Sequence, residues 1–393
     1  MKDEKIIYLK GNRICPDPID GSLTIKNLVN EYFNGYNAAR LKEICQLVSL
    51  KMSQPDVFIG VSLSGALTPA GLGSSCIVPL MRMGMIDYII STGANLYHDL
   101  HHSLNLELLQ GSPFVNDNEL FENNIIRIYD IFMDFNVLTN TDHWLITTMA
   151  QPEFQKRMGT RELHQLIGKY ADQVESKLNT TGKSIIAEAY RLGVPIYTSS
   201  PGDSTLGMDI AALNLIGKEI FIDPSIDVNE TSAIVLEAKL KGKSGVIVFG
   251  GGSPKNFILQ TEPTLQEVLG IDIKGHDYFA QITDARPDTG GLSGATPYEA
   301  VSWAKIDPET VHHSVVCYCD TTIVMPILVG YLQDLGIRKT PRKLCEKIPV
   351  LIENLRKAFL AENNSGDGNR NVSEVVKFLK ETWKETKVFS RPK

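Results

Sequence analysis

Short apolar runs alternate with longer segments of helical periodicity along most of the chain. The apolar runs predict buried strands at 57–61, 88–90, 195–197, 245–249 and 315–318. Helical periodicity predicts helices at 25–51, 75–85, 161–179, 208–215, 230–239, 257–269 and 321–335. This alternation predicts an α/β fold in which a mostly parallel sheet carries helices on both faces.

The same pattern divides the 393 residues into three parts. Residues 1–52 are expected to form an N-terminal helical extension. Residues 53–360 form the main α/β domain, in which 101–160 carries few strand signals and is expected to be an insertion or a lid. Residues 361–393 contain a polar loop at 363–369, followed by a final helix.

Composition and charge narrow the classes of function. The formal net charge of −7 argues against nucleic-acid binding and is compatible with a cationic ligand without requiring one. The opening residues, MKDEKIIYLK, are charged where a secretion signal needs an apolar core, and no run of about 18 apolar residues occurs. The six cysteines are scattered without a CxxC pair, which favours reduced thiols over disulfides or a zinc site. We expect a cytoplasmic protein without nucleic-acid or membrane partners.

Loops rich in Gly, Ser, Thr and Asp follow five of the predicted strands. In chain order they are SLSGALTPAGLG, STGANLYHDLHH, SSPGDSTLGMD, GGGSPKN and YCDTT. Parallel sheets bind ligands at the carboxyl ends of their strands, where glycines admit a pyrophosphate and helix starts stabilise its charge. Each loop alone is more often only a turn, and no GxGxxG fingerprint occurs. Their repetition after successive strands predicts a dinucleotide site.

The segment TGGLSGATPYEAVSWAKI, residues 289–306, predicts a glycine-containing loop followed by a short helix. Thr296 suits the N-cap and Pro297 the first helical position, with Glu299 three residues after the cap. Asp307-Pro308 disfavours continuation, so the helix should end near 303–306.

Two interpretations of this helix remain open. In the structural one, which spacing alone favours, Glu299 caps the helix, Trp303 belongs to the core and Lys305 is a cation near the C-terminus. In the functional one, Lys305 is an amine nucleophile in a desolvated site, and Glu299 and Trp303 receive an organic cation. Lys305 lies about 120° from Glu299 on an ideal helix, so the three converge only if the helix ends or bends.

A histidine cluster requires a separate judgement. His98, His101 and His102 can share one helical face, but no distant Cys or His is placed to complete a metal shell, so we predict no metal. A Ser-His-Asp hydrolase is not supported either, because no GxSxG motif occurs.

The segment EAVSWAKI, with SGATP just before it, resembles the active-site segment of the deoxyhypusine synthase family, which carries EAVSWGKI. The likeness runs from about residue 58 to 332 and includes FIGVSLSGALTPAG, IDYIISTGANLYHDL, PIYTSSPGDSTLGMD, VIVFGGGSPKN and VVCYCDTTIVMPIL. The pattern TGGLSGATP is more similar to the bacterial and archaeal deoxyhypusine synthase-like branch than to the eukaryotic enzyme.

This resemblance implies a Rossmann-like sheet that binds NAD, so that 53–360 would be an NAD-binding catalytic domain, and a homotetramer with sites at subunit interfaces. It also implies a three-step reaction. NAD takes hydride from spermidine, the resulting imine passes its aminobutyl group to the active lysine with loss of diaminopropane, and an acceptor amine then receives the group, which is reduced.

The resemblance also assigns roles to individual positions. Lys305 is expected to be the covalent nucleophile. The positions expected to bind the polyamine are Glu299, Trp303, Asp209 and His98. The positions expected to contact NAD are Ser62, Ser64, Thr92, Gly93, Ala94, Asp203, Gly251, Gly252, Ser293, Cys319 and Asp320.

Three positions depart from the eukaryotic members. Leu292 stands where they have a substrate-anchoring aspartate, Asn256 where they have a histidine, and His98 where they have a glutamate. A histidine and a carboxylate are natural proton carriers, so either His98 or Asp99 is a possible substitute.

The acceptor is therefore open. A protein lysine would give deoxyhypusine, and putrescine would give homospermidine. A non-catalytic NAD- or polyamine-binding homologue is a third reading, against which the retention of Lys305 in a near-intact motif argues.

Overall fold

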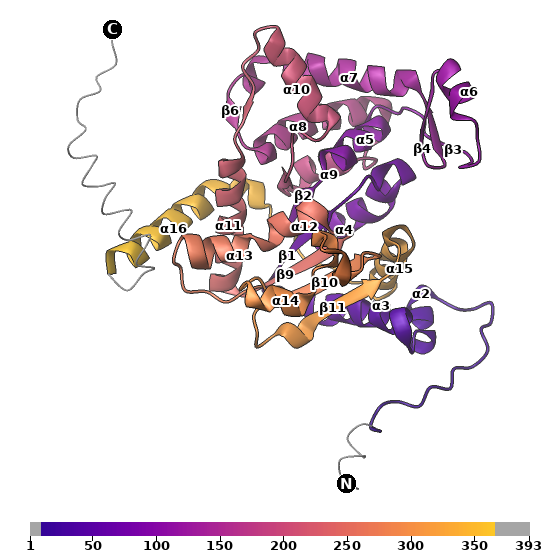
Figure 1. Cartoon of the computed structure of the whole chain (residues 1–393), viewed down its shortest axis with the longest axis vertical. Helices are drawn as coiled ribbons and strands as arrows, with labels where there is room; N and C mark the ends of the chain where they lie inside the picture. The colour runs from indigo at the N-terminus through magenta and orange to yellow at the C-terminus, as the bar shows by residue number, and fades with distance from the viewer. Residues whose placement is uncertain (1–8, 366–393) are drawn as a thin grey trace.

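The computed structural model describes residues 9–365 and contains a central parallel sheet of six strands in the order β11-β10-β9-β1-β2-β7 (Figure 1). The strands are β1 (Val57–Leu63), β2 (Tyr88–Ser91), β7 (Ile196–Thr198), β9 (Lys243–Phe249), β10 (Tyr278–Thr283) and β11 (Ser314–Tyr318). All five predicted strands are present, and the predicted α/β fold class is confirmed. The pattern missed β10, whose apolar residues are interrupted by the buried Gln281.

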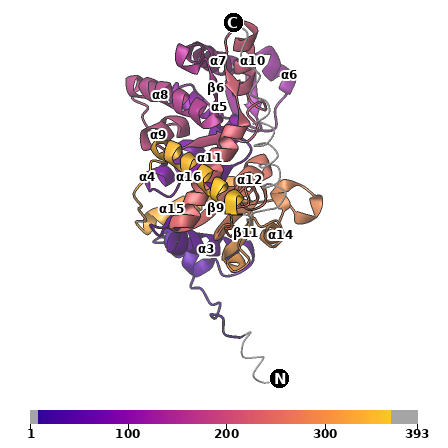
Figure 2. The ribbon, with the colours of Figure 1, turned by 90° about the vertical axis from the view of Figure 1, so that its left-hand side faces the viewer.

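Helices cover both faces of the sheet. Alternate side chains of β1 belong to different hydrophobic clusters, since Ile59 and Val61 pack with one cluster and Phe58 with the other. The first cluster includes side chains of α3 (Tyr36–Leu47), α4 (Val78–Arg82), α9 (Ile185–Leu192) and α15 (Thr321–Asp334). The second includes those of α11 (Pro224–Lys241), α12 (Gly252–Leu259) and α16 (Leu344–Ser365). Figure 2 shows α16 lying alongside α11.

The prediction of one continuous helix over 25–51 is wrong, because the structure breaks this segment in two. The structure has α2 (Ile25–Asn27) continued by a π-helical turn over Leu28–Tyr32, and a new start at α3, which continues as a π-helical turn over Val48–Met52. The break falls at Asn34-Gly35, where the Asn34 side chain donates to the Glu31 carbonyl at 2.5 Å. Gly35 is extended and precedes α3 as its N-cap. Both residue types favour turns over helix interiors.

Most of the segment between β2 and β9 lies at one end of the molecule (Figures 1 and 2). Its helices are α5 (Gly93–Ser103), α6 (Asp117–Glu122), α7 (Phe135–Met149), α8 (Thr160–Leu178) and α10 (Thr205–Leu215). An antiparallel sheet in the order β3-β5-β4 comprises β3 (Leu109–Gln110), β4 (Ile125–Ile128) and β5 (Ile131–Asp134). A parallel pair joins β6 (Arg157–Met158) to β8 (Phe221–Ile222). The region 101–160 therefore contains strands that its sequence pattern did not indicate.

The segments that follow β9, β10 and β11 lie away from that end, in the middle and lower parts of Figure 1. After α12 come α13 (Thr261–Pro263) and a π-helical turn (Thr264–Val268), where a single helix over 257–269 was predicted. After β10 come two 3₁₀ turns (Pro287–Thr289 and Leu292–Gly294) and α14 (Pro297–Ser302). Further short turns are Thr68–Ala70, Gly73–Ile77, Pro152–Phe154 and Val311–His313.

The C-terminal helix α16 runs to Ser365. The predicted polar loop over 363–369 is therefore wrong for 363–365, which are helical. The rest of that loop and the predicted final helix lie outside the described residues. Within residues 9–365, the longest apolar helical stretch falls short of what a membrane crossing requires.

Candidate functional site

The helix predicted to carry the candidate nucleophile begins as expected. Thr296 is its N-cap, and the Thr296 hydroxyl accepts a hydrogen bond from the Glu299 backbone N–H at 3.2 Å. Pro297 occupies the first helical position. This cap fixes the direction in which α14 leaves the turn over 292–294.

The helix ends at Ser302, and the chain then reverses at Ala304. Ala304 has φ 55°, in the left-handed region. Its N–H donates to the Val301 carbonyl at 2.9 Å, and the Lys305 N–H donates to the Ala300 carbonyl at 3.0 Å. These bonds form a Schellman C-cap, in which the left-handed position is usually glycine. The reversal supplies the bend that Lys305 needs to approach the face of Glu299.

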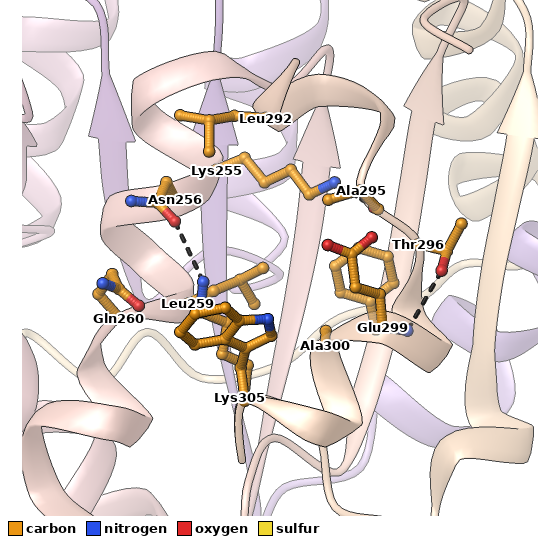
Figure 3. A pocket seen from close by; sticks show the side chains of 12 residues that line it. Lys255, Asn256, Leu259, Gln260, Leu292, Ala295, Thr296, Glu299, Ala300 and Lys305 are labelled. Carbon is orange, nitrogen blue, oxygen red and sulfur yellow. Dashed lines mark hydrogen bonds between the residues drawn. The ribbon is translucent and has the colours of Figure 1, made fainter. Parts of the chain in front are cut away.

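A cavity of about 290 Å³ opens between this helix, the turn before it and α12 (Figure 3). Glu299, Trp303 and Lys305 all line it, as do two of the three residues that depart from the eukaryotic members, Leu292 and Asn256. The remaining lining residues are Lys255, Leu259, Gln260, Phe279, Ala295, Thr296 and Ala300. Trp303 is 63% exposed, so the structural interpretation was wrong to assign Trp303 to the core.

Lys305 has two defined neighbours in the cavity. Its Nζ donates to Asn256 Oδ1 at 3.1 Å and lies 5.7 Å from the centroid of the Trp303 ring. Burial lowers the pKa of the Lys305 amine, while the Glu299 carboxylate raises it and so offsets part of that effect. A lowered pKa increases the fraction of free amine near neutral pH, which is the form that attacks an imine or carbonyl carbon.

Lys255 is a second lysine of the cavity, which the sequence pattern did not single out. Lys255 is 3% exposed, and its Nζ donates to Gln281 Oε1 at 2.9 Å and to the Ser293 and Ala295 carbonyls at 3.2 and 2.7 Å. Burial lowers the pKa of Lys255 to about 8; Glu299 raises it and Lys305 lowers it. These bonds hold the turn over 292–295 against β10. The available signal was a lysine within GGGSPKN, a loop already expected to bind a ligand.

Several residues predicted to contact NAD lie together at the carboxyl edge of the sheet. The Gly251 N–H donates to Ser64 Oγ at 3.0 Å, and the Gly252 N–H donates to Ser293 Oγ at 2.8 Å. A Cβ on Gly251 would lie 2.4 Å from Ser293 Cα, so glycine is required for this approach. The loops after β1, β9 and β10 are thus joined through these four residues.

The predicted contacts after β2 and β7 lie beside this group. Thr92 caps α5, accepting from the Asn95 N–H at 3.2 Å and donating to the Gly65 carbonyl at 2.6 Å. Gly93 and Ala94 form the first turn of α5, where a Cβ on Gly93 would lie 2.1 Å from Ser204 Oγ. Asp203 immediately precedes Ser204 in the loop after β7.

Of the three remaining predicted NAD contacts, two lie in the loop after β11 and one is buried within β1. Cys319 and Asp320 follow β11, with the Cys319 N–H donating to the Thr283 carbonyl at 3.1 Å and Asp320 capping α15. Ser62 is fully buried within β1, so its hydroxyl is not exposed to a ligand.

The strand edge fits the pyrophosphate of a dinucleotide. The N-termini of α5 and α12 open there, after β2 and β9, and Gly251, the N-cap of α12, provides no side-chain cap. Glycine at a helix start lets an anion approach the backbone closely, and here the Ser64 and Ser293 hydroxyls accept from the Gly251 and Gly252 N–H groups.

Asp209 and His98 do not line the cavity with Lys305. They belong to α10 and α5, at the opposite end of the molecule from α14 (Figures 1 and 2). Burial, with Asp142 as a further cause, raises the pKa of Asp209 to about 7, and its Oδ2 has no hydrogen-bond partner in the structure. Burial, with His102 as a further cause, lowers the pKa of His98 to about 4.

The neighbouring histidines are held by contacts within that same end. His98 Nδ1 lies 3.0 Å from His101 Nε2, and His101 Nδ1 lies 2.8 Å from Thr141 Oγ1. Asp99 is fully buried and accepts from the Ile186 N–H at 3.1 Å. Over residues 9–365, no three His, Cys, Asp or Glu side chains are grouped to hold a metal ion.

Comparisons with known proteins agree with the sequence motifs. The family model described as deoxyhypusine synthase matches residues 27–332. The chain is 51% identical over 358 residues to the "Deoxyhypusine synthase-like protein" of Cyanothece sp., covering 90% of each chain. It is 36% identical over 323 residues to the "Probable deoxyhypusine synthase 2" of Methanosarcina acetivorans, covering 82% of this chain and 88% of the other. A crystal structure of a candidate deoxyhypusine synthase from Entamoeba histolytica shares the fold, with a TM-score of 0.53 at 14% identity and coverage of 83% and 99%.

Proposed function

This chain belongs to the deoxyhypusine synthase family, and on that premise we propose that it is an NAD-dependent transferase of aminobutyl groups. Spermidine is the proposed donor and a protein lysine the proposed acceptor, which would give deoxyhypusine. The observation that carries the proposal is one cavity in which the Lys305 amine, the Glu299 carboxylate and the Trp303 indole converge.

Lys305 is the proposed nucleophile. Its free amine adds to the imine carbon of the oxidised donor, and the bond from that carbon to diaminopropane breaks, so diaminopropane leaves with the electron pair and a proton. The acceptor amine then adds to the same carbon and releases Lys305. Burial favours the free amine that the attack needs.

The neighbours of Lys305 have proposed roles in binding and orientation. Glu299 pairs with the terminal ammonium of the aminobutyl group, and the Trp303 ring adds a cation–π contribution of about 0.5–2 kcal/mol. Asn256 accepts a hydrogen bond from Lys305 and so orients its nitrogen. An amide does not change protonation state in this range, so Asn256 can orient Lys305 but cannot carry its proton.

The proposed cofactor is NAD, held by the glycine loop 250–252 and the N-termini of α5 and α12. When bound, NAD accepts a hydride from the donor amine and returns one to the transferred group. We further propose the homotetramer that the resemblance implies. Asp209 and His98, which lie away from the cavity of their own chain, would then contribute through a subunit interface.

Product analysis tests this proposal. The full-length protein is incubated with spermidine and NAD, either alone, with putrescine, or with a lysine-bearing translation factor, and products are identified by mass spectrometry. We expect NAD-dependent release of diaminopropane and a mass increase on the protein acceptor. Formation of homospermidine in the putrescine arm, with the protein acceptor unmodified, would instead identify the small-molecule reaction.

The matched variant is Lys305→Arg, which keeps the positive charge but stays protonated and cannot attack an imine. We expect it to release no diaminopropane while remaining folded. Turnover by Lys305→Arg close to that of the wild type, or release of diaminopropane without NAD, would rule out the proposed mechanism.

A further inference from the structure

A buried polar cluster adjoins the main chain that carries Lys305, outside the cavity itself. Glu262 of α13 and His276, which precedes β10, are both fully buried. His276 Nδ1 lies 2.5 Å from the Ser244 hydroxyl and 3.5 Å from Glu262 Oε1. Their own chain encloses these side chains, so a subunit interface does not change their surroundings.

His276 holds the main chain on both sides of Ile306. The His276 N–H donates to the Lys305 carbonyl at 3.0 Å, and the Asp307 N–H donates to the His276 carbonyl at 3.2 Å. These bonds form a parallel β-bridge between His276 and Ile306. A Cβ on Gly275 would lie 2.6 Å from the Ile306 carbonyl carbon, so the two backbones are in direct contact. The position of the Lys305 carbonyl is therefore set by His276.

Gln266, in the π-helical turn after α13, holds the preceding carbonyl. Its Nε2 donates to the carbonyl of the left-handed Ala304 at 3.0 Å. The Gln266 side chain also approaches Glu262 closely enough to lower the pKa of that carboxyl. Gln266 and His276 thus hold two consecutive carbonyls of the segment 304–307. Both of them approach Glu262.

The main chain around His276 is itself fixed to α11 and β9. Lys239 Nζ donates to the Gly275 carbonyl at 2.9 Å and to Asp277 Oδ2 at 2.8 Å. The Ser244 N–H donates to the same Asp277 oxygen at 2.9 Å, and the Asp277 N–H donates to the Ser244 carbonyl at 2.8 Å. The segment 304–307 is therefore tied through His276 to the start of a central strand.

Glu262 is an unusual residue for a position that only fills space. Burial raises the pKa of Glu262 well above its usual range, and Lys239 offsets part of this effect. Burial lowers the pKa of His276 to about 4, with Lys239 as a further cause. Both groups are therefore uncharged near neutral pH. Neither Glu262 oxygen makes a hydrogen bond of normal length and angle with the described residues, and a buried polar group so poorly compensated costs stability that an apolar side chain would not.

We propose that Glu262 is a positioning residue for the nucleophile: with His276 and Gln266 it fixes the main chain of 304–307, and so the direction in which the Lys305 side chain enters the cavity. The inference rests on the proposed function, because it concerns the nucleophile assigned there. Displacement of a reacting group by about 1 Å can slow a reaction by about 100-fold. A side chain that touches neither substrate nor cofactor can therefore govern turnover.

Two substitutions separate the polar group of Glu262 from its bulk. Glu262→Gln keeps a neutral donor and acceptor on a side chain of the same length, whereas Glu262→Met has neither. We expect Glu262→Met to lower kcat for diaminopropane release by about 10- to 100-fold with little change in the KM for spermidine. Glu262→Gln should restore most of the activity. A loss of the same size in both variants, a change in KM alone, or an unchanged kcat in Glu262→Met would overturn the proposal.

A second readout needs neither spermidine nor NAD. Butanal condenses with the Lys305 amine with loss of water, cyanoborohydride reduces the imine to a stable secondary amine, and peptide mass spectrometry measures the product as a function of pH. We expect Glu262→Met to move the midpoint for Lys305 upward, toward that of surface lysines, because a displaced amine regains water. Glu262→Gln should leave the midpoint near that of the wild type.

A milder variant covers the case in which Glu262→Met does not fold. Gln266 is only half-buried, so Gln266→Met removes little more than the donor to the Ala304 carbonyl and should move the midpoint in the same direction. The matched control is Ile167→Ala in α8, which lowers stability by removing fully buried volume at the other end of the molecule. An unmoved midpoint in Gln266→Met, or an equal shift in Ile167→Ala, would contradict the positioning role.

The two readouts separate this proposal from the proposed function. If the wild type releases no diaminopropane but Glu262→Met still shifts the trapping midpoint, the transferase assignment fails and the positioning role stands. If transfer occurs and Glu262→Met matches the wild type in both kcat and midpoint, the positioning role fails and the transferase stands.

Discussion

Replacement of Ala304 by glycine tests the chain reversal that brings Lys305 into the cavity. Ala304 has φ 55°, and a left-handed conformation costs a residue with a side chain about 1–2 kcal/mol. Glycine removes this cost but adds freedom to the unfolded chain, which disfavours folding by about 0.4–1 kcal/mol. The difference predicts that Ala304→Gly raises the free energy of unfolding by about 0.8 kcal/mol, within a range of roughly 0–1.6 kcal/mol.

The matched control is the same change at a right-handed position. Ala361 is exposed within α16, where glycine should lower the free energy of unfolding by about 1 kcal/mol. Both variants remove one methyl group, so the sign of the effect depends on the backbone conformation. Urea unfolding followed by circular dichroism gives the midpoints, which are compared at one protein concentration and only where the slopes agree.

The two variants should therefore differ in sign, by almost 2 kcal/mol in total. If Ala304→Gly instead destabilises the protein as much as Ala361→Gly does, Ala304 is not left-handed in solution. The C-cap that directs Lys305 toward Glu299 would then be wrong, and with it the convergence of the site.

Three further changes have expected outcomes. Because burial lowers the pKa of Lys305, reductive trapping of butanal on Lys305 should reach half its maximum at a lower pH than trapping on surface lysines, as measured by peptide mass spectrometry. Glu299→Gln should move the midpoint for Lys305 to a still lower pH, and a shift to higher pH would contradict the assigned causes. Lys255→Met should lower the free energy of unfolding by about 2–5 kcal/mol, since Gln281 and two carbonyls lose their buried donor, and an unchanged urea midpoint would refute the bonds assigned to it. Burial raises the pKa of Asp209 to about 7, so its ionisation should make the wild type lose stability as pH rises from about 4 to 7. Asp209→Asn should remove this loss, and identical pH profiles of the urea midpoint in the variant and the wild type would disprove the assignment to Asp209.

Local patterns predicted most of the sheet because β1, β2, β7 and β9 after Lys243 are buried on both faces. Such strands appear as continuous apolar runs, and five of the six were found in this way. Apart from Met133, the residues of the short strands β3, β4 and β5 are half-buried or exposed, so burial leaves little trace in their sequence. The break before α3 was visible as Asn34-Gly35, but the apolar periodicity on either side of it suggested one helix.

The site was predictable where its residues follow local rules. The N-cap by Thr296 and the first-turn Pro297 follow from residue type and spacing. The convergence of Lys305 with Glu299 does not, because it depends on a left-handed alanine and alanine carries no signal for that conformation. The separation of Asp209 and His98 from this cavity is likewise a property of the tertiary arrangement, which spacing along the chain does not contain.

The missed strand and the missed lysine have one physical cause. A glutamine within an apolar run argues against a buried strand, and a lysine is rarely placed in a core, so local rules pass over both Gln281 and Lys255. Each polar side chain is hydrogen-bonded in its buried position. Lys255 donates to Gln281 Oε1. Gln281 Nε2 in turn donates to the Gly250 and Ser293 carbonyls at 2.9 and 2.8 Å. This buried polar pair joins the glycine loop to the turn that carries Leu292. Residues that break the local pattern in this chain thus lie where the cavity and the expected cofactor edge meet, as expected when a functional site overrides the general rules of folding.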